Sequence, residues 1–314
     1  MAGKILSQAG INTQILEKSK GVGGRMATRR FKGGVFDHGA QFFTVRDNEF
    51  QKWIMDWQKG DVIQTWFGHE SKINAMYPPE SHPRFIGRKG MTSVPKDVSK
   101  GLRIQTNTQI NLVTRVGNLW VAKTHKGDEF GAKRIILSAP VPQSLMLLEA
   151  GRVSIPKHEY DALRAIEYQP CIAGLVLLAA SSGIPYPGGK KFDEGDIQWL
   201  GDNSQKGISP DVSAVTIHAS AEFSRNNFEM EAGELADLLI SAASDWLGQE
   251  VLDWQIHKWR YSQPIVNFEQ RFLDIPQLSG LFLTGDAFGG ARVEGAALSG
   301  IEAAKHILEI NSIQ

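Results

Sequence analysis

The 314-residue sequence lacks several features that point to particular classes of protein. Its single cysteine, Cys171, excludes an internal disulfide framework and a metal site built from several cysteines. Basic and acidic residues number 34 each, so the formal net charge is zero, and nothing predicts a nucleic-acid or acidic-membrane partner. The longest apolar run, residues 172–180, is too short to span a bilayer.

Other signals are missing as well. No paired-ligand spacing such as HExxH occurs, so we expect no metal site. Cys171 lies in an apolar stretch, which predicts a buried structural thiol rather than a nucleophile. No basic segment followed by an apolar one opens the chain, so we expect a cytoplasmic protein. No internal repeat or low-complexity segment is visible.

The stretch from residue 281 to residue 301 carries the first positive signal. An apolar strand over 281–284 leads to Gly285 and Asp286, then to a glycine-rich loop and a helix from Glu294 through residue 310. A carboxylate at a strand end can hold a ribitol hydroxyl, and the N-terminus of a helix can stabilise the negative charge of a reduced flavin. The alternative is an ordinary strand–loop–helix unit of an α/β protein.

A second signal lies near the start of the chain. Glu17 ends a strand, where a carboxylate can bind an adenosine ribose. The glycines of the following loop, Gly21, Gly23 and Gly24, let backbone N–H groups approach a pyrophosphate, and Arg25 adds a charged donor. Together the two ends of the chain predict a flavin-binding protein.

The order of a glutamate, a GxGGRxxT loop and a distant Gly-Asp resembles the FAD-binding signatures of the flavin-containing amine oxidase superfamily. Residues 21–30 (GVGGRMATRR), 36–43 (FDHGAQFF) and 259–264 (WRYSQP) resemble the renalase-like branch in particular. The resemblance implies an α/β fold of the p-hydroxybenzoate hydroxylase/amine oxidase type. In that fold a Rossmann-like FAD/NAD(P)-binding domain, here residues 1–45, 90–145 and 268–314, carries an inserted α+β substrate domain, here residues 46–89 and 146–267.

The first strand and the GxGxxG turn of such a domain are absent from the sequence. The chain instead opens with a helical pattern that ends at Gly10 and is followed directly by a strand over 12–16. We therefore expect an N-terminal truncation relative to the family, with Met1 either an internal methionine or the start of a damaged gene. Weak FAD binding and low stability are the expected consequences, because the neighbouring strands would lose their partner.

The resemblance also implies a set of cofactor contacts. The backbone of residues 39–41 should lie beside the isoalloxazine ring, and Val113 should contact the adenine through its main chain. No cysteine precedes the last helix, so FAD is expected to be non-covalent. Glu294 has an alternative role as a purely electrostatic helix-start carboxylate. The predicted cofactor-binding residues are Glu17, Lys18, Gly23, Gly24, Arg25, Met26, Gly39, Ala40, Gln41, Val113, Gly285, Asp286, Arg292, Glu294, Gly295 and Ala296.

The candidate catalytic or substrate-binding residues are His38, Trp259, Arg260 and Tyr261. His38 is a candidate base, with a structural hydrogen-bonding role as the alternative. Alternation over residues 254–264 places His257, Trp259 and Tyr261 on one strand face and Arg260 on the other. Trp259 and Tyr261 could form a flat aromatic slot, while Arg260 and Arg292 could bind phosphates. The alternative is an aromatic strand that packs two domains together.

These residues predict a flavin-dependent oxidoreductase, because flavin accepts a hydride and the protein supplies position and electrostatics. The renalase-like resemblance implies oxidation of isomeric dihydronicotinamide dinucleotides, 2- or 6-dihydroNAD(P), with O2 as the acceptor, by a monomer or weak homodimer. The alternatives are an amine oxidase, a carotenoid or lipid desaturase, and a non-catalytic truncated remnant.

Periodicity and turn residues predict the remaining elements. We expect helices over 46–58, 141–150, 157–166 and 229–247. We expect strands within 60–77 and over 110–116, 119–124, 170–180, 197–200 and 214–218, with Gly117-Asn118 as a turn.

Overall fold

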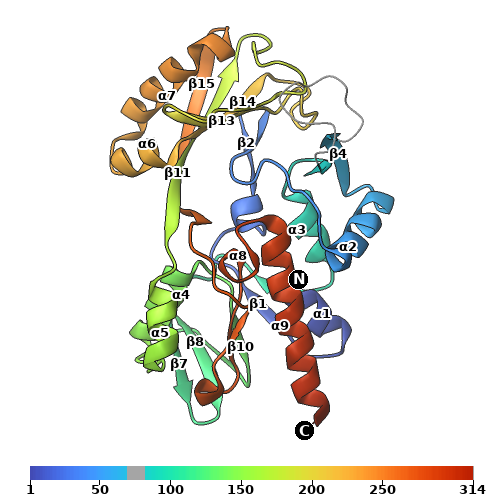
Figure 1. Cartoon of the computed structure of the whole chain (residues 1–314), viewed down its shortest axis with the longest axis vertical. Helices are drawn as coiled ribbons and strands as arrows, with labels where there is room; N and C mark the ends of the chain where they lie inside the picture. The colour runs from blue at the N-terminus through green and yellow to red at the C-terminus, as the bar shows by residue number, and fades with distance from the viewer. Residues whose placement is uncertain (69–81, 314) are drawn as a thin grey trace. The chain divides into compact units, whose positions relative to one another are not determined.

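The fold was analysed in a computed structural model that describes residues 1–68 and 82–313. The chain divides into two compact units. The first unit contains residues 1–22, 98–168 and 263–314, and the second contains residues 23–97 and 169–262. Both mix helices with strands (Figure 1), so the architecture is α/β as expected.

The first unit contains two small sheets with parallel pairing. Strand β1 (Gln14–Leu16) pairs in parallel with β6 (Arg103–Gln105). Strand β10 (Ile135–Leu137) pairs in parallel with β17 (Leu281–Leu283), whose other edge holds the short antiparallel β16 (Leu273–Asp274). An antiparallel meander of β7 (Ile110–Val116), β8 (Leu119–Thr124) and β9 (Glu129–Ala132) completes the strands of this unit.

Helices cover these strands. Helix α9 (Val293–Ile313) runs beside α1 (Ala2–Gln8) (Figure 1), and Leu6 packs against Phe282 and Ile307. Helices α4 (Val141–Ala150) and α5 (Lys157–Arg164) pack on the meander and on β10 and β17, around the fully buried Trp120. A 3₁₀ turn, η2 (Pro276–Leu278), precedes β17. This core holds in place the strand end at residue 284, where a functional segment was predicted.

The second unit is built on a five-stranded sheet. Its strand order is β12 (Gly189–Lys191), β13 (Ile197–Asp202), β14 (Ala214–Ala219), β11 (Tyr168–Leu178) and β15 (Val251–Pro264). Helices α6 (Ala221–Asn226) and α7 (Ala232–Leu247) pack on one face through an apolar cluster that includes Leu235, Leu239 and Ile217 (Figure 1).

The β2–β3 hairpin lies against this sheet. Strands β2 (Thr28–Phe31) and β3 (Gly34–Asp37) pair with each other, and Phe36 packs on Leu175 and Leu177 of β11. A second hairpin, β4 (Ile63–Phe67) and β5 (Arg84–Gly87), is accompanied by α2 (Asn48–Lys59) and α3 (Ser93–Val98). The side chain of Asp47 caps α2 by accepting bonds from the backbone N–H groups of residues 49 and 50.

Most predicted elements are confirmed, and some were missed. The strands over 110–116 and 119–124 have the predicted bounds, and the predicted helix over 229–247 begins later, at residue 232. The loop predicted after Asp286 is instead a short helix, α8 (Asp286–Gly289), which α9 supports by direct packing. The β2–β3 hairpin and the 3₁₀ turn η1 (Gly24–Met26) were not predicted. The strands expected within 60–77 lie partly outside the described residues.

Candidate functional site

Each unit carries part of the predicted cofactor-binding set. In the first unit, Glu17 directly follows β1, and its carboxylate Oε1 accepts a 2.7 Å hydrogen bond from the backbone N–H of Ser19. This bond shapes the loop after the strand and leaves further lone pairs on the carboxylate for a ligand hydroxyl. Lys18 is exposed beside it. Val113 is buried within β7, where its backbone pairs with Ala122 of β8.

The other predicted cofactor-binding residues of the first unit lie around α8 and the start of α9. Asp286 and Glu294 are both buried carboxylates, and the backbone N–H of Gly285 donates to Ser299 Oγ at 3.0 Å. The two helices meet backbone to backbone. A Cβ atom built on Gly295 would lie 2.1 Å from the carbonyl oxygen of Gly290. Glycine is therefore required at position 295 for α8 and α9 to approach each other, whether or not a ligand is bound. Ala296 is half-buried in α9, whereas Arg292 is exposed.

In the second unit, Arg25 joins two segments that are far apart in the sequence. Its Nη1 donates to the carbonyl oxygens of Ser262 and Tyr261 at 3.0 and 3.4 Å. Its own carbonyl oxygen accepts a 2.8 Å bond from the N–H of Ala40. A Cβ atom at Gly39 would lie 2.1 Å from the same oxygen. The absence of a side chain at Gly39 thus lets the backbone of Arg25 pack against it. That the isoalloxazine ring also lies beside Gly39 stays a prediction.

The segment from Asp37 to Gln41 is held by a buried polar network. The carboxylate of Asp37 accepts hydrogen bonds from Lys206 Nζ at 2.7 Å, from Thr28 Oγ1 at 2.7 Å and from the N–H of Met91 at 2.8 Å. Both side chains of the Asp37–Lys206 ion pair are fully buried. Burial lowers the pKa of the Lys206 ammonium, while the Asp37 carboxylate opposes that shift. Gln41 Nε2 donates to the carbonyl oxygens of Asp37 and Gly39.

The carbonyl oxygens of this segment are also fixed from the sheet. Thr216 Oγ1 on β14 donates to the carbonyl oxygen of Asp37 at 3.1 Å. Trp259 Nε1 on β15 donates to the carbonyl oxygen of His38 at 2.8 Å, and His218 Nε2 lies 3.2 Å from the same oxygen. Residues 37–41 are therefore a rigid strip rather than a mobile loop, as a segment that positions a cofactor or substrate requires.

His38 belongs to an aromatic cluster with His257 and Trp259. The ring centroids of His38 and His257 are 4.8 Å apart, and those of His257 and Trp259 are 4.3 Å apart. These contacts confirm that alternation places His257 and Trp259 on one face of β15. Burial, and then the neighbouring His257 and Arg29, lower the pKa of His38 to about 3. The imidazole is therefore neutral at physiological pH.

Arg260 lies on the other face of β15, as alternation predicted. Its Nη2 lies 2.9 Å from Glu229 Oε1, and its guanidinium stacks over the Phe228 ring at 4.3 Å from the centroid. Lys258, on the same face, donates to the carbonyl oxygen of Met230 at 2.6 Å. Arg260 thus sits apart from the His38 cluster that contains Trp259.

Three histidines with lowered pKa values make stability sensitive to acid. Burial lowers the pKa of His218 to about 4 and that of His257 to about 4, in addition to the shift at His38. In the unfolded chain these imidazoles bind protons as the pH falls below 6.5, their ordinary pKa. The folded state does not bind them until the pH is much lower. Acid therefore favours unfolding, and the loss of stability begins near pH 6.5 and continues down to the folded pKa values.

We expect the free energy of unfolding to fall by about 2 kcal/mol at pH 5 for each fully buried imidazole. Urea unfolding at pH 7.5 and pH 5 measures this loss. His218→Asn should reduce the difference between the two pH values, because it removes one titrating group. His125→Asn, at an exposed position, should leave the difference unchanged. An equal pH dependence in the wild type and His218→Asn would contradict the assignment.

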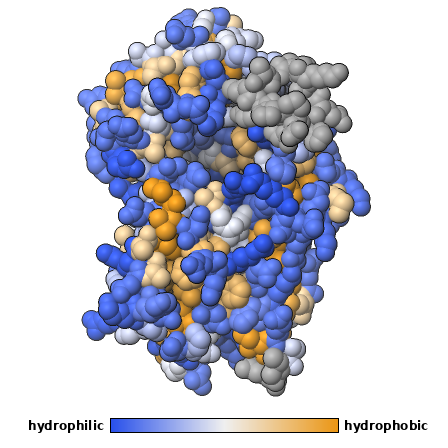
Figure 2. All heavy atoms as spheres, viewed as in Figure 1, coloured by the Kyte–Doolittle hydropathy of each residue, from blue (hydrophilic) through white to orange (hydrophobic). Residues whose placement is uncertain are grey.

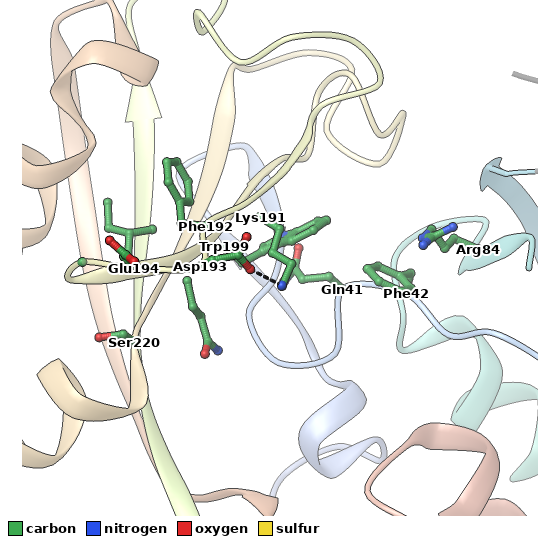
Figure 3. Close-up of a pocket in the computed structure, with 12 residues that line it drawn as sticks. Gln41, Phe42, Arg84, Lys191, Phe192, Asp193, Glu194, Trp199 and Ser220 are labelled. Carbon is green, nitrogen blue, oxygen red and sulfur yellow. Dashed lines mark hydrogen bonds and ion pairs between the residues drawn. The ribbon is translucent and has the colours of Figure 1, made fainter. Parts of the chain in front are cut away.

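The second unit also contains a pocket of about 630 Å³. Aromatic and charged side chains from the segment after β3, from β5 and from the β12–β13 hairpin line it (Figure 3). The lining includes Gln41, the last residue of the rigid strip, the adjacent Phe42, Arg84 from β5, and Trp199 from β13. Lys191 and Asp193 form an ion pair at its rim.

The predicted cofactor-binding residues of the first unit have the chemistry that a flavin nucleotide needs. Glu17 and Asp286 supply carboxylates that can hold hydroxyl groups. In the same unit, Cβ atoms placed on Gly21 and Gly290 would meet no heavy atom within 4 Å, so these glycines border open space that a ligand can enter. Dinucleotide sites use glycines in this way to admit phosphates to the backbone.

Comparison with known proteins identifies the family. The family model for flavin-containing amine oxidoreductases matches residues 1–57 and 50–308. The chain belongs to the flavin-containing amine oxidoreductase family. Members of this family are flavin-dependent oxidoreductases, so the superfamily and the enzyme class predicted from the sequence are confirmed.

Solved structures show the same fold. A putative protoporphyrinogen oxidase from Exiguobacterium sp. 255-15 superposes with a TM-score of 0.73 at 13% identity, covering 98% of this chain and 95% of that one. Putrescine oxidase bound to putrescine superposes with a TM-score of 0.68 at 12% identity, covering 98% and 96%. At such low identity these matches establish the fold alone.

The described residues contain neither a membrane-spanning helix nor a metal-binding cluster. No helix among the described residues is long and apolar enough to cross a membrane. Within residues 1–68 and 82–313, no group of three or more His, Cys, Asp or Glu side chains is arranged to hold a metal ion. Hydrophilic residues cover most of the molecular face that Figure 2 shows. Cys171 is buried, as predicted, and burial raises the pKa of its thiol to about 12.

Sequence reasoning missed several residues of the polar network and the pocket. Lys206, Asn203 and Thr216 all contact Asp37, at sequence separations of 169, 166 and 179 residues. No local pattern could reveal these partners. Arg84 is the first residue of β5 and Trp199 lies within β13, and neither position carries a local sequence signal for a pocket.

Proposed function

We propose that this family member is renalase-like. It would oxidise isomeric dihydronicotinamide dinucleotides, 2- or 6-dihydroNAD(P), using non-covalently bound FAD and O2. Arg25 Nη1 binds the carbonyl oxygens of Tyr261 and Ser262, and this is the observation that carries the proposal. The two sequence segments that resemble the renalase-like branch, residues 21–30 and 259–264, are therefore parts of one assembly. The aromatic pair His257–Trp259 adjoins the third segment at His38.

When bound, the flavin supplies a two-electron acceptor for hydride and a route for those electrons to O2. The chain's own residues need to orient the donor, exclude water and avoid protonating it. A dihydronicotinamide needs no strong base, because its ring nitrogen assists hydride loss and the product is an aromatic cation. The neutral, buried imidazole of His38 suits this requirement, since it adds no positive charge near the cation.

The proposed function divides the chain into two domains. The FAD-binding domain would comprise residues 1–45, 90–145 and 268–314, and the substrate domain residues 46–89 and 146–267. Glu17 would bind the adenosine ribose, Asp286 the ribitol, and the start of α9 the flavin edge that becomes negative. The enzyme would be cytoplasmic, and a monomer or weak homodimer.

The visible absorption spectrum of the purified protein tests this function. We expect flavin bands, and we expect them to bleach rapidly when 6-dihydroNAD(P) or 2-dihydroNAD(P) is added without oxygen. Admission of air should restore the bands and produce hydrogen peroxide. Bands that persist with both isomers would refute the renalase-like assignment.

Amine oxidation is the second candidate. The aromatic pocket with Glu194 at its edge favours it, because aromatic rings and a carboxylate can bind an ammonium group. Putrescine oxidase shares the fold. Bleaching by putrescine or a monoamine, with no response to dihydronicotinamides, would support this candidate. A lipid substrate is disfavoured by the charged side chains that line the pocket.

A further inference from the structure

Two buried polar atoms in the wall of the pocket are unpaired. Gln41 Oε1, an acceptor, and Trp199 Nε1, a donor, have no hydrogen-bond partner among the described residues, and both residues line the pocket (Figure 3). Both residues are more than nine-tenths buried. A buried donor or acceptor without a partner costs free energy, so nearly all such groups in proteins are paired. The two atoms therefore point to a ligand group that pairs with both.

The two atoms face one point beside Gly201 of β13. A Cβ atom built on Gly201 would lie 2.6 Å from Gln41 Oε1 and 3.1 Å from Trp199 Nε1. Gly201 lies in a strand and does not have a positive φ, so its backbone conformation does not by itself require glycine. What glycine provides at this position is space between the acceptor and the donor.

Contacts within the protein fix the orientation of both groups. Nε2 of Gln41 donates to the carbonyl oxygens of Asp37 and Gly39, so the oxygen end of the amide is the end that faces Gly201. The indole ring of Trp199 packs on the Phe42 ring, with centroids 5.7 Å apart. An acceptor and a donor that are positioned in advance bind a matching ligand group at a lower entropic cost.

The pairing of one acceptor with one donor selects among ligand groups. An ammonium group offers only donors and would leave Trp199 Nε1 unpaired. A carboxylate offers only acceptors and would leave Gln41 Oε1 unpaired. A primary carboxamide carries an acceptor oxygen and an NH2 donor side by side, so it satisfies both atoms at once.

We propose that Gln41 and Trp199 recognise the carboxamide of the substrate's nicotinamide ring. Trp199 Nε1 donates to the carboxamide oxygen, and Gln41 Oε1 accepts from the carboxamide NH2. The inference rests on the proposed function for the identity of the ring that carries the carboxamide. Access to the two buried atoms requires side chains of the pocket wall to shift, as side chains commonly do on binding.

Oxidised dinucleotides test the site without turnover. By calorimetry on the flavin-loaded enzyme we would compare NAD with 3-acetylpyridine adenine dinucleotide, in which a methyl group replaces the NH2, and with nicotinic acid adenine dinucleotide, which carries a carboxylate. NAD should bind about two- to ten-fold more tightly than the acetylpyridine analogue, which loses the hydrogen bond to Gln41. The acid analogue should bind more weakly still, because its carboxylate would face Gln41 Oε1.

Substitutions on each side of the site should have different effects. Trp199→Phe removes the donor, so it should weaken NAD and the acetylpyridine analogue alike, since both keep the carbonyl oxygen. Gly201→Ala places a methyl group between the two polar atoms, so the preference for NAD over the acetylpyridine analogue should disappear.

Matched controls separate the site from general effects. Trp66→Phe removes an indole N–H that already donates to the carbonyl oxygen of Pro187 at 2.8 Å, and Trp66 is outside the pocket lining, so neither affinity should change. Gly174→Ala alters β11 of the same sheet, where the added Cβ would lie no closer than 3.5 Å to the surrounding side chains. This variant should keep the preference for NAD.

Several results would overturn the inference. Equal affinities of NAD and the acetylpyridine analogue for the wild type would assign the two atoms to a water molecule or a ribose hydroxyl instead. Unchanged NAD affinity in Trp199→Phe, or an unchanged preference in a folded Gly201→Ala variant, would also contradict it. The comparison of analogues on the wild type decides the matter even if a variant fails to fold.

Failure of this inference and failure of the proposed function give different results. A preference for the carboxamide without flavin bleaching by dihydronicotinamides would retain the site and refute the reaction. Bleaching in the wild type, with equal affinities for NAD and the acetylpyridine analogue, would retain the reaction and refute the site. No measurable binding of NAD to the wild type would refute the site outright.

Discussion

Lys206→Met should lower the free energy of unfolding by about 3–5 kcal/mol, the usual cost of removing one partner from a buried ion pair. The substitution leaves the fully buried Asp37 carboxylate without its only charged partner among the described residues. Methionine has a similar length and can keep contact with the Trp66 ring, over which the ammonium lies at 5.0 Å. The loss should therefore reflect the charge rather than a cavity. Urea unfolding at pH 7.5 measures it.

A second substitution separates the charge from packing. Asp37→Asn in the Lys206→Met background removes the uncompensated charge and keeps an oxygen that can accept from Thr28 Oγ1 or the N–H of Met91. We expect the double variant to be more stable than Lys206→Met alone. A double variant whose loss equals the sum of the two single losses would show that the pair is not coupled.

Lys206→Met alone should also alter the position of the rigid strip, residues 37–41. Lys206 fixes Asp37, and the backbone carbonyls of residues 37–39 accept bonds from Thr216, Trp259 and Gln41. If residues 39–41 of this strip lie beside the isoalloxazine ring, as the family resemblance implies, Lys206→Met should shift the visible flavin bands even at a temperature where the variant stays folded. Unshifted bands in a folded variant would place the strip away from the cofactor.

Gly295→Ala should lower both the free energy of unfolding and the flavin content of the protein. The added Cβ would lie 2.1 Å from the carbonyl oxygen of Gly290 and 2.5 Å from that of Gly289. Neither backbone atom can rotate away, so α8 and α9 must separate. Overpacking of this kind costs about 1–3 kcal/mol or more. Because the start of α9 is also a proposed flavin contact, we expect flavin content after gel filtration to fall well below that of the wild type.

Gly233→Ala is the matched control, since it lies near the start of another helix, α7, with no heavy atom within 4 Å of its Cβ position. Alanine there should be neutral or stabilise the protein by up to about 1 kcal/mol. Flavin content should stay at the wild-type level. Full flavin retention and unchanged stability in Gly295→Ala would mean that the α8–α9 junction tolerates movement.

The sequence was most informative where the determinants of structure are local. The strands over 110–116 and 119–124 are separated by Gly117 and Asn118, which favour a tight turn, and their bounds were predicted correctly. Alternation along residues 254–264 correctly placed Trp259 and Arg260 on opposite faces. The two glycine-rich ends of the chain were sufficient for the superfamily, because their residue spacing follows from how a backbone approaches phosphates.

Long-range partners could not be predicted in the same way. Asp37 was not among the predicted site residues, yet it is the centre of a network in which Lys206, Asn203 and Thr216 lie more than 160 residues further along the chain. The helix α8 was missed because four residues are too few for a periodic signal, and packing against α9 stabilises it. The substrate is likewise not encoded locally, since pocket residues come from four separate segments of the chain.

The backbone contacts at Gly39 and Gly295 have an evolutionary consequence. At both positions any side chain would collide with a carbonyl oxygen of the protein itself, so selection against substitution there is independent of the substrate. Among homologues that have diverged to oxidise different compounds, these two glycines should persist while Arg84 and Trp199 vary with the compound. Gly21, whose Cβ would point into open space, should drift in homologues that have stopped binding a nucleotide. Gly39 and Gly295 would thus record whether the fold has been retained, and Gly21 would record separately whether nucleotide binding has been retained.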